Sequence, residues 1–176
     1  MYIAIISVAP PYRGGISKHT SILAHKLSQK HLVKVVNYKR QYPKILFPGK
    51  TQYFTPHRIL GDRCLDSINP INWFNVSKKI VAGQFDLVIF RIWNPFFSPA
   101  LGIIALQLRK NSPNTKLISL CDNIVPHEHV PLGNFLTNYV LNKMHGHIVQ
   151  SAQIEKELNE ILDDPLYLKC LHPLYD

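Results

Sequence analysis

The chain has 176 residues, of which 46% are hydrophobic and 18% are charged, a balance typical of a globular domain and not of a disordered chain. Twenty lysines and arginines against eleven acidic residues give a net charge of +9, which favours nucleic acid, phosphorylated small molecules or an anionic membrane surface as partners. Three widely separated cysteines argue against a disulfide framework or a zinc site, and no apolar run is long enough to span a bilayer.

Strands and helices are predicted to alternate along the chain. The run from Ile3 to Val8 is apolar and β-branched and stops at Pro10-Pro11, as expected for a strand buried on both faces. Further strands are predicted at 32–38, 87–93, 116–121, 147–150 and 168–171, with a short one at 52–55. Helices are predicted from 17 to 27, at 72–84, across 101–108, at 134–144 and from 151 to 162. This order predicts right-handed βαβ units in one doubly wound, Rossmann-like α/β domain over residues 1–176, with a parallel sheet covered on both faces.

The turn between the first strand and the first helix carries two adjacent glycines, Gly14 and Gly15. Glycine opens φ values that other residues avoid and leaves no side chain over the turn. Ser17 is expected to cap the helix, where free backbone N–H groups and the helix dipole favour an anion. Arg13 and Lys18 flank this corner with positive charge. We therefore expect Arg13, Gly14, Gly15 and Ser17 to bind a phosphate group; a tight turn without a ligand is the alternative.

The spacing of these glycines matches neither common nucleotide-binding motif. A dinucleotide fingerprint needs a third glycine, and a P-loop needs Gly-Lys-Ser/Thr, which does not follow here. The second strand ends at Asn37, Lys39 and Arg40, where a dinucleotide enzyme usually carries an acidic residue for the ribose. These residues argue against a nucleotide-dependent oxidoreductase.

Ligands of open α/β sheets bind beyond the carboxyl ends of the strands. Two more segments meet this condition: 91–94, after the central strand, and 122–129, after the strand at 116–121. The second reads DNIVPHEH and contains a carboxylate, an amide, Glu128 and two histidines. His127 and His129 alone do not define a zinc site, because a third ligand is missing, so no metal is expected. A polar loop that caps the following helix is the simplest alternative.

Two sequence segments resemble one enzyme family. PPYRGGISKHTSILAHKL resembles the first loop and helix of GT-B glycosyltransferases of family 4, and ISLCDNIVPHE resembles a segment beside their reacting sugar. Asn123 and 126–128 match that second segment as they stand, whereas Asp122 replaces the usual histidine. HIVQSAQIEKEL resembles the family's strand-Ser-helix unit, and LHPLYD resembles the start of its interdomain linker. The resemblance covers nearly the whole chain.

The resemblance, together with the strand-end positions, implies roles for six residues. The expected catalytic residues are Asp122 and His127, and the expected substrate-binding residues are Arg91, Asn94, Asn123 and Glu128. The exchange of histidine for Asp122 leaves the local role open: a carboxylate accepts a hydrogen bond from an acceptor hydroxyl but repels a diphosphate.

The resemblance also implies a missing partner. Family 4 enzymes carry a second Rossmann-like domain that supplies most contacts to the sugar nucleotide, and residues 1–176 contain no match to it. We expect that donor domain in a further part of the polypeptide or in a partner chain, and the isolated chain to be inactive. The family retains the anomeric configuration without a metal, so the nucleotide-sugar is expected as co-substrate and no cofactor. The expected acceptor is a sugar or a lipid-linked molecule of cell-envelope polysaccharide or glycolipid synthesis.

The region 39–58 mixes basic and aromatic residues between prolines, which predicts salt-sensitive contact with anionic lipid. Its basic residues are Lys39, Arg40, Lys44, Lys50 and Arg58, and its aromatic residues are Tyr42, Phe47, Tyr53 and Phe54. An ordinary loop packed on the domain is the alternative. No RNA-binding signature accompanies these residues, so no nucleic-acid partner is expected. The expected location is the cytoplasm or the inner face of the cell membrane. A second hypothesis for the whole chain is a non-catalytic basic module that binds phosphorylated ligands or membrane.

Overall fold

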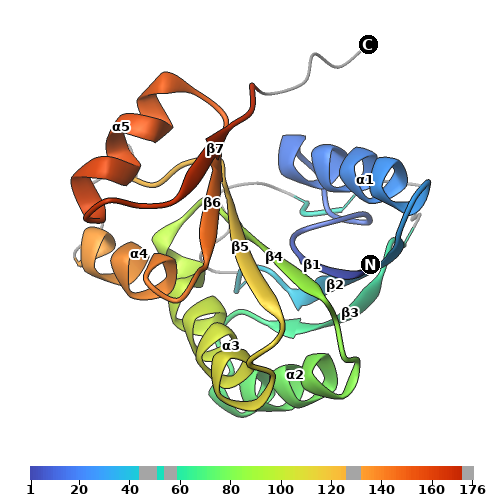
Figure 1. Cartoon of the computed structure of the whole chain (residues 1–176). Coiled ribbons are helices and arrows are strands. Elements are labelled where there is room, and N and C mark those ends of the chain that lie inside the picture. Colours follow the sequence, from blue (N-terminus) through green and yellow to red (C-terminus); the bar gives the residue numbers. More distant parts are fainter. Residues whose placement is uncertain (44–50, 54–58, 126–131, 172–176) are drawn as a thin grey trace.

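The computed structural model describes residues 1–43, 51–53, 59–125 and 132–171. Within these residues seven parallel strands form one sheet in the order β3-β2-β1-β4-β5-β6-β7 (Figure 1). The strands are β1 (Tyr2–Ile6), β2 (Leu32–Arg40), β3 (Asp62–Asp66), β4 (Leu87–Ile92), β5 (Lys116–Cys121), β6 (Gly146–Val149) and β7 (Tyr167–Lys169). The helices are α1 (Gly15–Ser28), α2 (Pro70–Ala82), the short 3-10 helix η2 (Pro95–Phe97), α3 (Ser98–Asn111), α4 (Gly133–Leu141) and α5 (Ala152–Ile161).

The chain winds outward from the centre of the sheet in both directions. From β1 it passes through α1 to β2 and β3 at one edge, then returns through α2 to β4 beside β1 and continues to β7 at the other edge. Right-handed crossovers therefore place α1 on one face and α2 to α5 on the opposite face (Figure 1). The predicted doubly wound α/β fold is confirmed.

The central strands are buried on both faces, as their continuous apolar runs predicted. In β1, Ile3 and Ile5 pack in the cluster beneath α1, while Ala4 and Ile6 pack with the side chains of α2 to α5. In a parallel sheet between two layers every strand residue meets apolar neighbours, so no polar alternation is needed.

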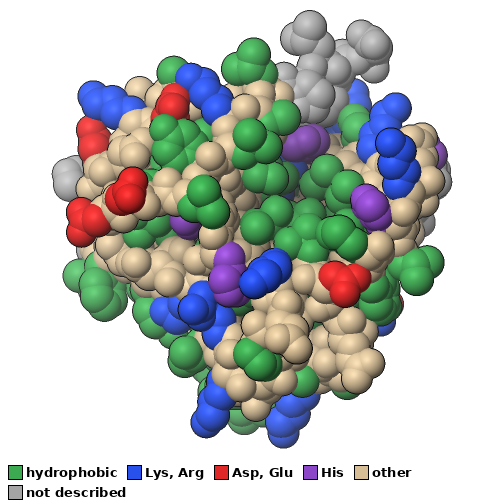
Figure 2. Space-filling model, viewed as in Figure 1, with side chains coloured by type: hydrophobic (Ala, Val, Ile, Leu, Met, Phe, Trp, Pro, Cys, Tyr) green, Lys and Arg blue, Asp and Glu red, His purple; other side chains and the backbone are tan. Residues whose placement is uncertain are grey.

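The two faces are covered unequally. Of the five α-helices in the described residues, α2 to α5 lie on one face and α1 lies on the other. Beyond β4 the α1 face carries Ile118, Ile148 and Leu168, of which Leu168 is 65% exposed. Figure 2 shows the resulting field of hydrophobic side chains between α1 and α5. The expectation that both faces are fully covered is therefore met only on the side of α2 to α5.

Helices α2 and α5 begin at side-chain caps that the local sequence supplies. The Asn69 side chain caps α2 by accepting from the Asn72 N–H at 3.2 Å, and Ser151 caps α5 by accepting from Ile154 at the same distance. The first helix differs and is described with the site. No helix in the described part of the chain is both long and apolar enough to cross a bilayer.

Strand β3 was not predicted, because its residues show no apolar alternation. The sequence Asp62-Arg63-Cys64-Leu65-Asp66 pairs with β2 at the sheet edge, with two register shifts. Of residues 52–55, where a strand was predicted, Tyr53 forms a single antiparallel bridge with Tyr12. Residues 62–66 therefore form an edge strand because they pair with β2, and not because of an apolar pattern in their own sequence.

A buried histidine joins β5 to β6 and sets an expected pH dependence. His147 Nδ1 lies 2.7 Å from Ser119 Oγ, and burial lowers the His147 pKa from 6.5 to about 4. The unfolded chain therefore binds the proton first as the pH falls. Stability that is complete above pH 6.5 is lost progressively toward pH 4, by up to about 3 kcal/mol.

Urea unfolding across this pH range measures the effect. The His147→Gln variant is expected to show a flatter profile between pH 6.5 and pH 4 than the unmodified protein. His25→Gln, on the exposed side of α1, is the control for the loss of a histidine side chain. Equal slopes in all three proteins would contradict the assignment to His147.

Candidate functional site

The sheet order places a topological switch point at the carboxyl ends of β1 and β4, the position at which open α/β sheets form their ligand crevice. These strands are neighbours, but the chain leaves β1 toward β2 on one side and leaves β4 toward β5 on the other. Ile6 pairs with Phe90 and Ile92 with Cys121, so the ends of β1, β4 and β5 share one edge. Three segments that the sequence singled out, namely 13–17, 91–94 and 122–123, follow these ends.

The helix that follows β1 begins without a side-chain cap. Its N-cap is Gly14 at φ 112°, no acidic residue lies in the first turn, and the first helical bond runs from Lys18 N–H to the Gly14 carbonyl. A Cβ added at Gly14 or Gly15 would meet nothing within 4 Å, so the helix end faces open space. Among the described residues the N–H groups of 15–17 have no partner. Unpaired N–H groups and the helix dipole together favour an anion here.

Ser17 does not cap this helix, so that prediction is wrong. The positive φ of Gly14 lets the helix begin at Gly15, which places Ser17 inside the first turn. Its side chain is buried, and its Oγ has no hydrogen-bond partner in the described part of the chain. Arg13 is exposed beside the corner, and its N–H donates to the Gln52 carbonyl at 2.9 Å.

Asn37 holds the loop that carries the glycine corner, a role that sequence reasoning missed. Its Nδ2 donates to the carbonyls of Ala9, Pro10 and Leu60 at 3.0–3.2 Å, and its Oδ1 accepts from the N–H groups of Ala9 and Tyr38. The side chain is fully buried. At the strand end where a dinucleotide enzyme usually carries an acid that binds the ribose, this chain has Asn37, whose side chain holds the backbone of the loop. Its place at the end of an apolar strand was the available signal.

Arg91 and Asp122, predicted as separate site residues, form one ion pair. Arg91 Nε and Nη2 each lie 2.5 Å from an Asp122 carboxylate oxygen. The Arg91 side chain is 1% exposed and that of Asp122 is 14% exposed. Asp122 thus presents the accessible end of the pair, while the guanidinium beneath balances its charge. The repulsion expected between Asp122 and a diphosphate is correspondingly reduced.

The two asparagines predicted as site residues, Asn94 and Asn123, lie at the same edge of the sheet but differ in burial and hydrogen bonding. Asn94 is half-buried, and its Oδ1 accepts from the Phe96 N–H at 2.9 Å, which leaves its amide N–H groups for a ligand. Asn123 is exposed. His127 and Glu128 lie outside the described residues, and so does the alternative zinc motif at 127–129. Within the described residues no three His, Cys, Asp or Glu side chains are grouped to hold a metal ion.

Glu157 fixes the start of the segment after Asp122, and it too was missed. This buried side chain of α5 accepts from the N–H groups of Ile124 and Val125 at 3.4 and 3.2 Å. Gln153 donates to its other oxygen at 2.8 Å. The signal was positional: Glu157 lies three residues after Ile154 on the apolar side of α5, where an acid needs a buried partner.

The region predicted to contact lipid is engaged with the domain wherever it is described. Arg40 pairs with Asp66 at 2.6 Å, and Lys39 lies 4.0 Å from the same carboxylate. Tyr42 stacks on Phe96, with ring centroids 5.5 Å apart, and Tyr53 packs on Tyr12 at 5.0 Å. These two tyrosines are half-buried, which agrees, for the described residues, with the alternative of a loop packed on the domain. Lys44, Phe47, Lys50, Phe54 and Arg58 lie outside the described residues.

No protein-family model and no curated protein matches the sequence, but solved structures match the fold. An alpha-glucosyltransferase (AGT) in complex with UDP matches with a TM-score of 0.57 and 12% identity, over 96% of this chain and 43% of that chain. The chain has a glycosyltransferase fold. Two alpha-glucosyltransferase complexes agree. One holds UDP-glucose and DNA with an abasic site (TM-score 0.54, 12% identity, 96% of this chain and 42% of that one). The other holds UDP and a 13-mer DNA with a central A:G mismatch (TM-score 0.51, 11% identity, 86% of this chain and 37% of that one).

The matched part is less than half of each glucosyltransferase chain. Identities of 11–12% establish a shared fold and show neither family 4 nor a glycosyltransferase activity for this chain. The function of this chain therefore has to be argued from its own strand-end residues.

Proposed function

We propose that this chain is the acceptor-side domain of a glycosyltransferase that uses a nucleotide-sugar, and that a donor-binding domain or partner chain completes the enzyme. The observation that carries the proposal is the uncapped N-terminus of α1 at the crevice of a glycosyltransferase fold. The family 4 resemblance adds the finer proposal of retaining transfer in cell-envelope polysaccharide or glycolipid synthesis.

Each part of the crevice suits one part of such a reaction. The N–H groups at 15–17 suit the diphosphate of the donor, with Arg13 adding charge beside it. The Asp122 carboxylate, held by Arg91, suits a hydroxyl of the acceptor, because it accepts a hydrogen bond and its charge is already balanced. Asn94 and Asn123 offer amide groups to the same acceptor.

The acceptor class stays broad in this proposal. The prediction of no nucleic-acid partner finds no support in the comparisons, since two of the matched glucosyltransferase complexes contain DNA. DNA therefore belongs beside lipid-linked and free sugars in any acceptor panel. The alternative of a non-catalytic basic module would bind an anion at the same glycine corner. It predicts that no sugar is transferred even when a donor-binding domain or partner chain is added.

The Gly15→Val variant is expected to lose anion binding and keep its stability. Gly15 has no positive φ and no neighbour within 4 Å of an added Cβ, so valine fits, although the sequence had suggested strain at this position. The β-branched side chain nevertheless shields the helix N-terminus from a phosphate. An NMR titration with inorganic diphosphate and UDP-glucose should shift the amide signals of residues 15–17 in the unmodified protein and leave them in place in the variant.

Gly14→Val is the matched comparison. Gly14 has φ 112°, so valine there is strained and should lower the unfolding free energy by about 1–3 kcal/mol while it also impairs binding. If Gly15→Val binds diphosphate as well as the unmodified protein, the helix N-terminus is not the anion site. If Gly15→Val loses stability along with binding, the glycine pair is structural.

A further inference from the structure

A cluster of basic side chains lies at the amino edge of the sheet, where the strands begin and opposite the crevice. Arg109 is in the last turn of α3, and Lys116 begins β5. Lys143 and His145 lie in the connection from α4 to β6. The six residues of β5 separate this cluster from the crevice by about 17 Å. None of the four residues belongs to the crevice, so the cluster needs its own explanation.

The hydrogen bonds of His145 determine which ring nitrogen carries its proton. Nδ1 accepts from the Leu117 N–H at 3.0 Å, so the proton of the neutral ring is on Nε2. Burial, together with the nearby cations Arg109 and Lys116, lowers the pKa of His145 from its usual value of 6.5, so the ring is neutral at pH 7. His145 therefore presents an N–H donor at Nε2 and no acceptor.

Two hydrogen-bond donors face each other at this point. Arg109 Nη1 lies 3.5 Å from His145 Nε2, and a guanidinium nitrogen has no acceptor to offer. One Nη1 hydrogen is donated to the Lys143 carbonyl at 3.2 Å, which leaves the other beside the His145 N–H. Two donors do not bond to each other, so the arrangement is completed by an acceptor that reaches both of them.

No carboxylate balances the cations of this cluster within the described residues. Arg109, Lys116 and Lys143 form no ion pair there. Lys143 instead donates to the Tyr139 carbonyl at 2.6 Å and lies over the Tyr139 ring, 3.5 Å from its centroid. Burial and the charge of Arg109 lower the pKa of Lys143, as expected where cations lie close together.

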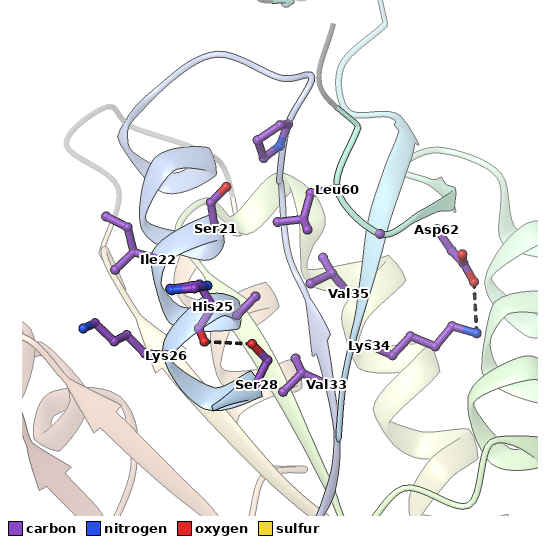
Figure 3. A pocket seen from close by; sticks show the side chains of 13 residues that line it. Ser21, Ile22, His25, Lys26, Ser28, Val33, Lys34, Val35, Leu60 and Asp62 are labelled. Carbon is purple, nitrogen blue, oxygen red and sulfur yellow. Dashed lines mark hydrogen bonds and ion pairs between the residues drawn. The ribbon is translucent and has the colours of Figure 1, made fainter. Parts of the chain in front are cut away.

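Lys34 shows the contrasting arrangement on the same sheet. Its Nζ lies 3.0 Å from the Asp62 carboxylate, and both side chains line the pocket beside α1 (Figure 3). The Asp62 carboxylate raises the pKa of Lys34, which is the opposite of the shift at Lys143. The basic cluster at the amino edge thus lacks the anion that Lys34 has.

The helix ends explain only part of this cluster. Arg109 at the end of α3 and Lys143 just past the end of α4 interact favourably with the negative ends of the two helix dipoles. That account leaves the donor contact between Arg109 and His145 without an acceptor. It also gives no role to Lys116, which begins a strand.

Acidic residues on either side limit the patch to a small anion. Asp86 directly precedes β4, the neighbour of β5, and Asp163 and Asp164 precede β7, the neighbour of β6. Because parallel strands begin at the same edge, these acids lie along that edge on both sides of the basic cluster. A nucleic acid needs a stripe of cations for successive phosphates, whereas this patch offers about one phosphate position.

We propose that Arg109, His145 and Lys116 form a binding site for a single phosphate group, either inorganic phosphate or the phosphate of a small molecule. A phosphate oxygen accepts from both Arg109 Nη1 and His145 Nε2, and Lys116 adds positive charge from the start of β5. The Lys143 ammonium, held over the Tyr139 ring, adds to the positive potential. The site stands independently of glycosyl transfer, because phosphate binding is measured without turnover.

An NMR titration with inorganic phosphate at constant ionic strength tests this site. In the unmodified protein the amide signals of residues 116–117 and 143–146 should shift. Arg109→Gln should weaken this binding at least about tenfold, because a charged donor is lost. Lys116→Gln should weaken it about threefold, because an exposed cation contributes less. The control Lys34→Gln removes an equal charge beside α1 and should bind as the unmodified protein does.

Two comparisons identify the ligand source and separate this site from the glycine corner. A parallel titration with glycerol 3-phosphate shows whether the site prefers an ester over inorganic phosphate. Gly15→Val should lose the shifts at 15–17 and keep those at 116–117 and 143–146, whereas Arg109→Gln should do the reverse. Failure of either site is therefore visible without failure of the other.

Four results would overturn the proposal. The first is the absence of shifts at 116–117 and 143–146 with millimolar phosphate, and the second is unchanged affinity in Arg109→Gln. The third is equal weakening by Lys34→Gln, which would make the binding a matter of net charge. The fourth is a DNA oligonucleotide that shifts these signals where phosphate does not, which would assign the patch to nucleic acid.

Urea unfolding confirms that each variant is folded. Arg109→Gln also loses the hydrogen bond to the Lys143 carbonyl, so its stability is the one most exposed to the substitution. Lys116→Gln changes an exposed side chain and keeps the test decisive if Arg109→Gln is unstable. Unchanged phosphate affinity in a folded Lys116→Gln would then exclude Lys116 from the site and contradict the proposal.

Discussion

Asp122→Ala should destabilise the protein by about 3 kcal/mol or more, a large effect for a residue at the rim of a crevice. The substitution leaves the Arg91 guanidinium, 1% exposed, without its counterion. Arg91 Nη1 already lacks a hydrogen-bond partner among the described residues, so no group is in place to take over. A buried charge that loses its partner costs more than the pair contributed.

The double variant Arg91→Met with Asp122→Ala is the decisive control. It removes the buried charge together with its partner, and methionine fills the same volume, so stability should recover to within about 1 kcal/mol of the unmodified protein. Urea unfolding of the two single variants and the double variant closes a double-mutant cycle. Additive losses would show that the two residues act separately. A stable double variant that no longer supports transfer in the completed enzyme would show that the Arg91–Asp122 pair serves the reaction as well as the fold.

Asn37→Leu should lower the unfolding free energy by at least about 3 kcal/mol, because the size is kept while every hydrogen bond is lost. Five bonds to the backbone of Ala9, Pro10, Tyr38 and Leu60 disappear, and these groups lie beneath the crevice loop. Leucine occupies the space, so water does not replace the side chain. Amide hydrogen exchange of residues 9–13 should also accelerate, since the loop loses its anchor.

Asn75→Leu provides the matched control on the exposed side of α2, where the same exchange should change stability by no more than about 0.5 kcal/mol. Urea unfolding and hydrogen exchange of both variants give the comparison. If Asn37→Leu costs no more than Asn75→Leu, the bonds of Asn37 do not hold the loop.

The elements that the sequence predicted well are those whose pattern is local. β1, β4 and β5 have apolar runs that only a sheet buried on both faces accommodates, and each agrees with its predicted range to within two residues. The alternation of such runs with helical spacing determined the parallel, doubly wound topology, because right-handed crossovers leave few other arrangements. The glycine corner was also predicted correctly as a turn that leads into a helix.

The elements and residues that were missed depend on partners far away in the sequence. Strand β3 has the composition of a polar loop and becomes a strand only by pairing with β2. Ser17 was predicted to cap α1, but the positive φ of Gly14 lets the helix begin at Gly15. The residue types alone do not reveal that φ value, so the sequence did not indicate the earlier start. Glu157 and Val125 are brought together by the packing of α5 beside β6, the strand that neighbours β5.

The crevice itself shows the same division. The sequence alone determined that Arg91 and Asp122 follow neighbouring strands, because strand ends share one edge in a parallel sheet. Only the tertiary structure decided that they form one buried pair, since a salt bridge between residues 31 apart depends on the register of β4 and β5 and on the burial of Arg91. Composition likewise established an excess of cations, whereas the turn of α1 decided that Lys18 and Lys26 share one exposed side of the helix, because side-chain direction is a property of the folded helix.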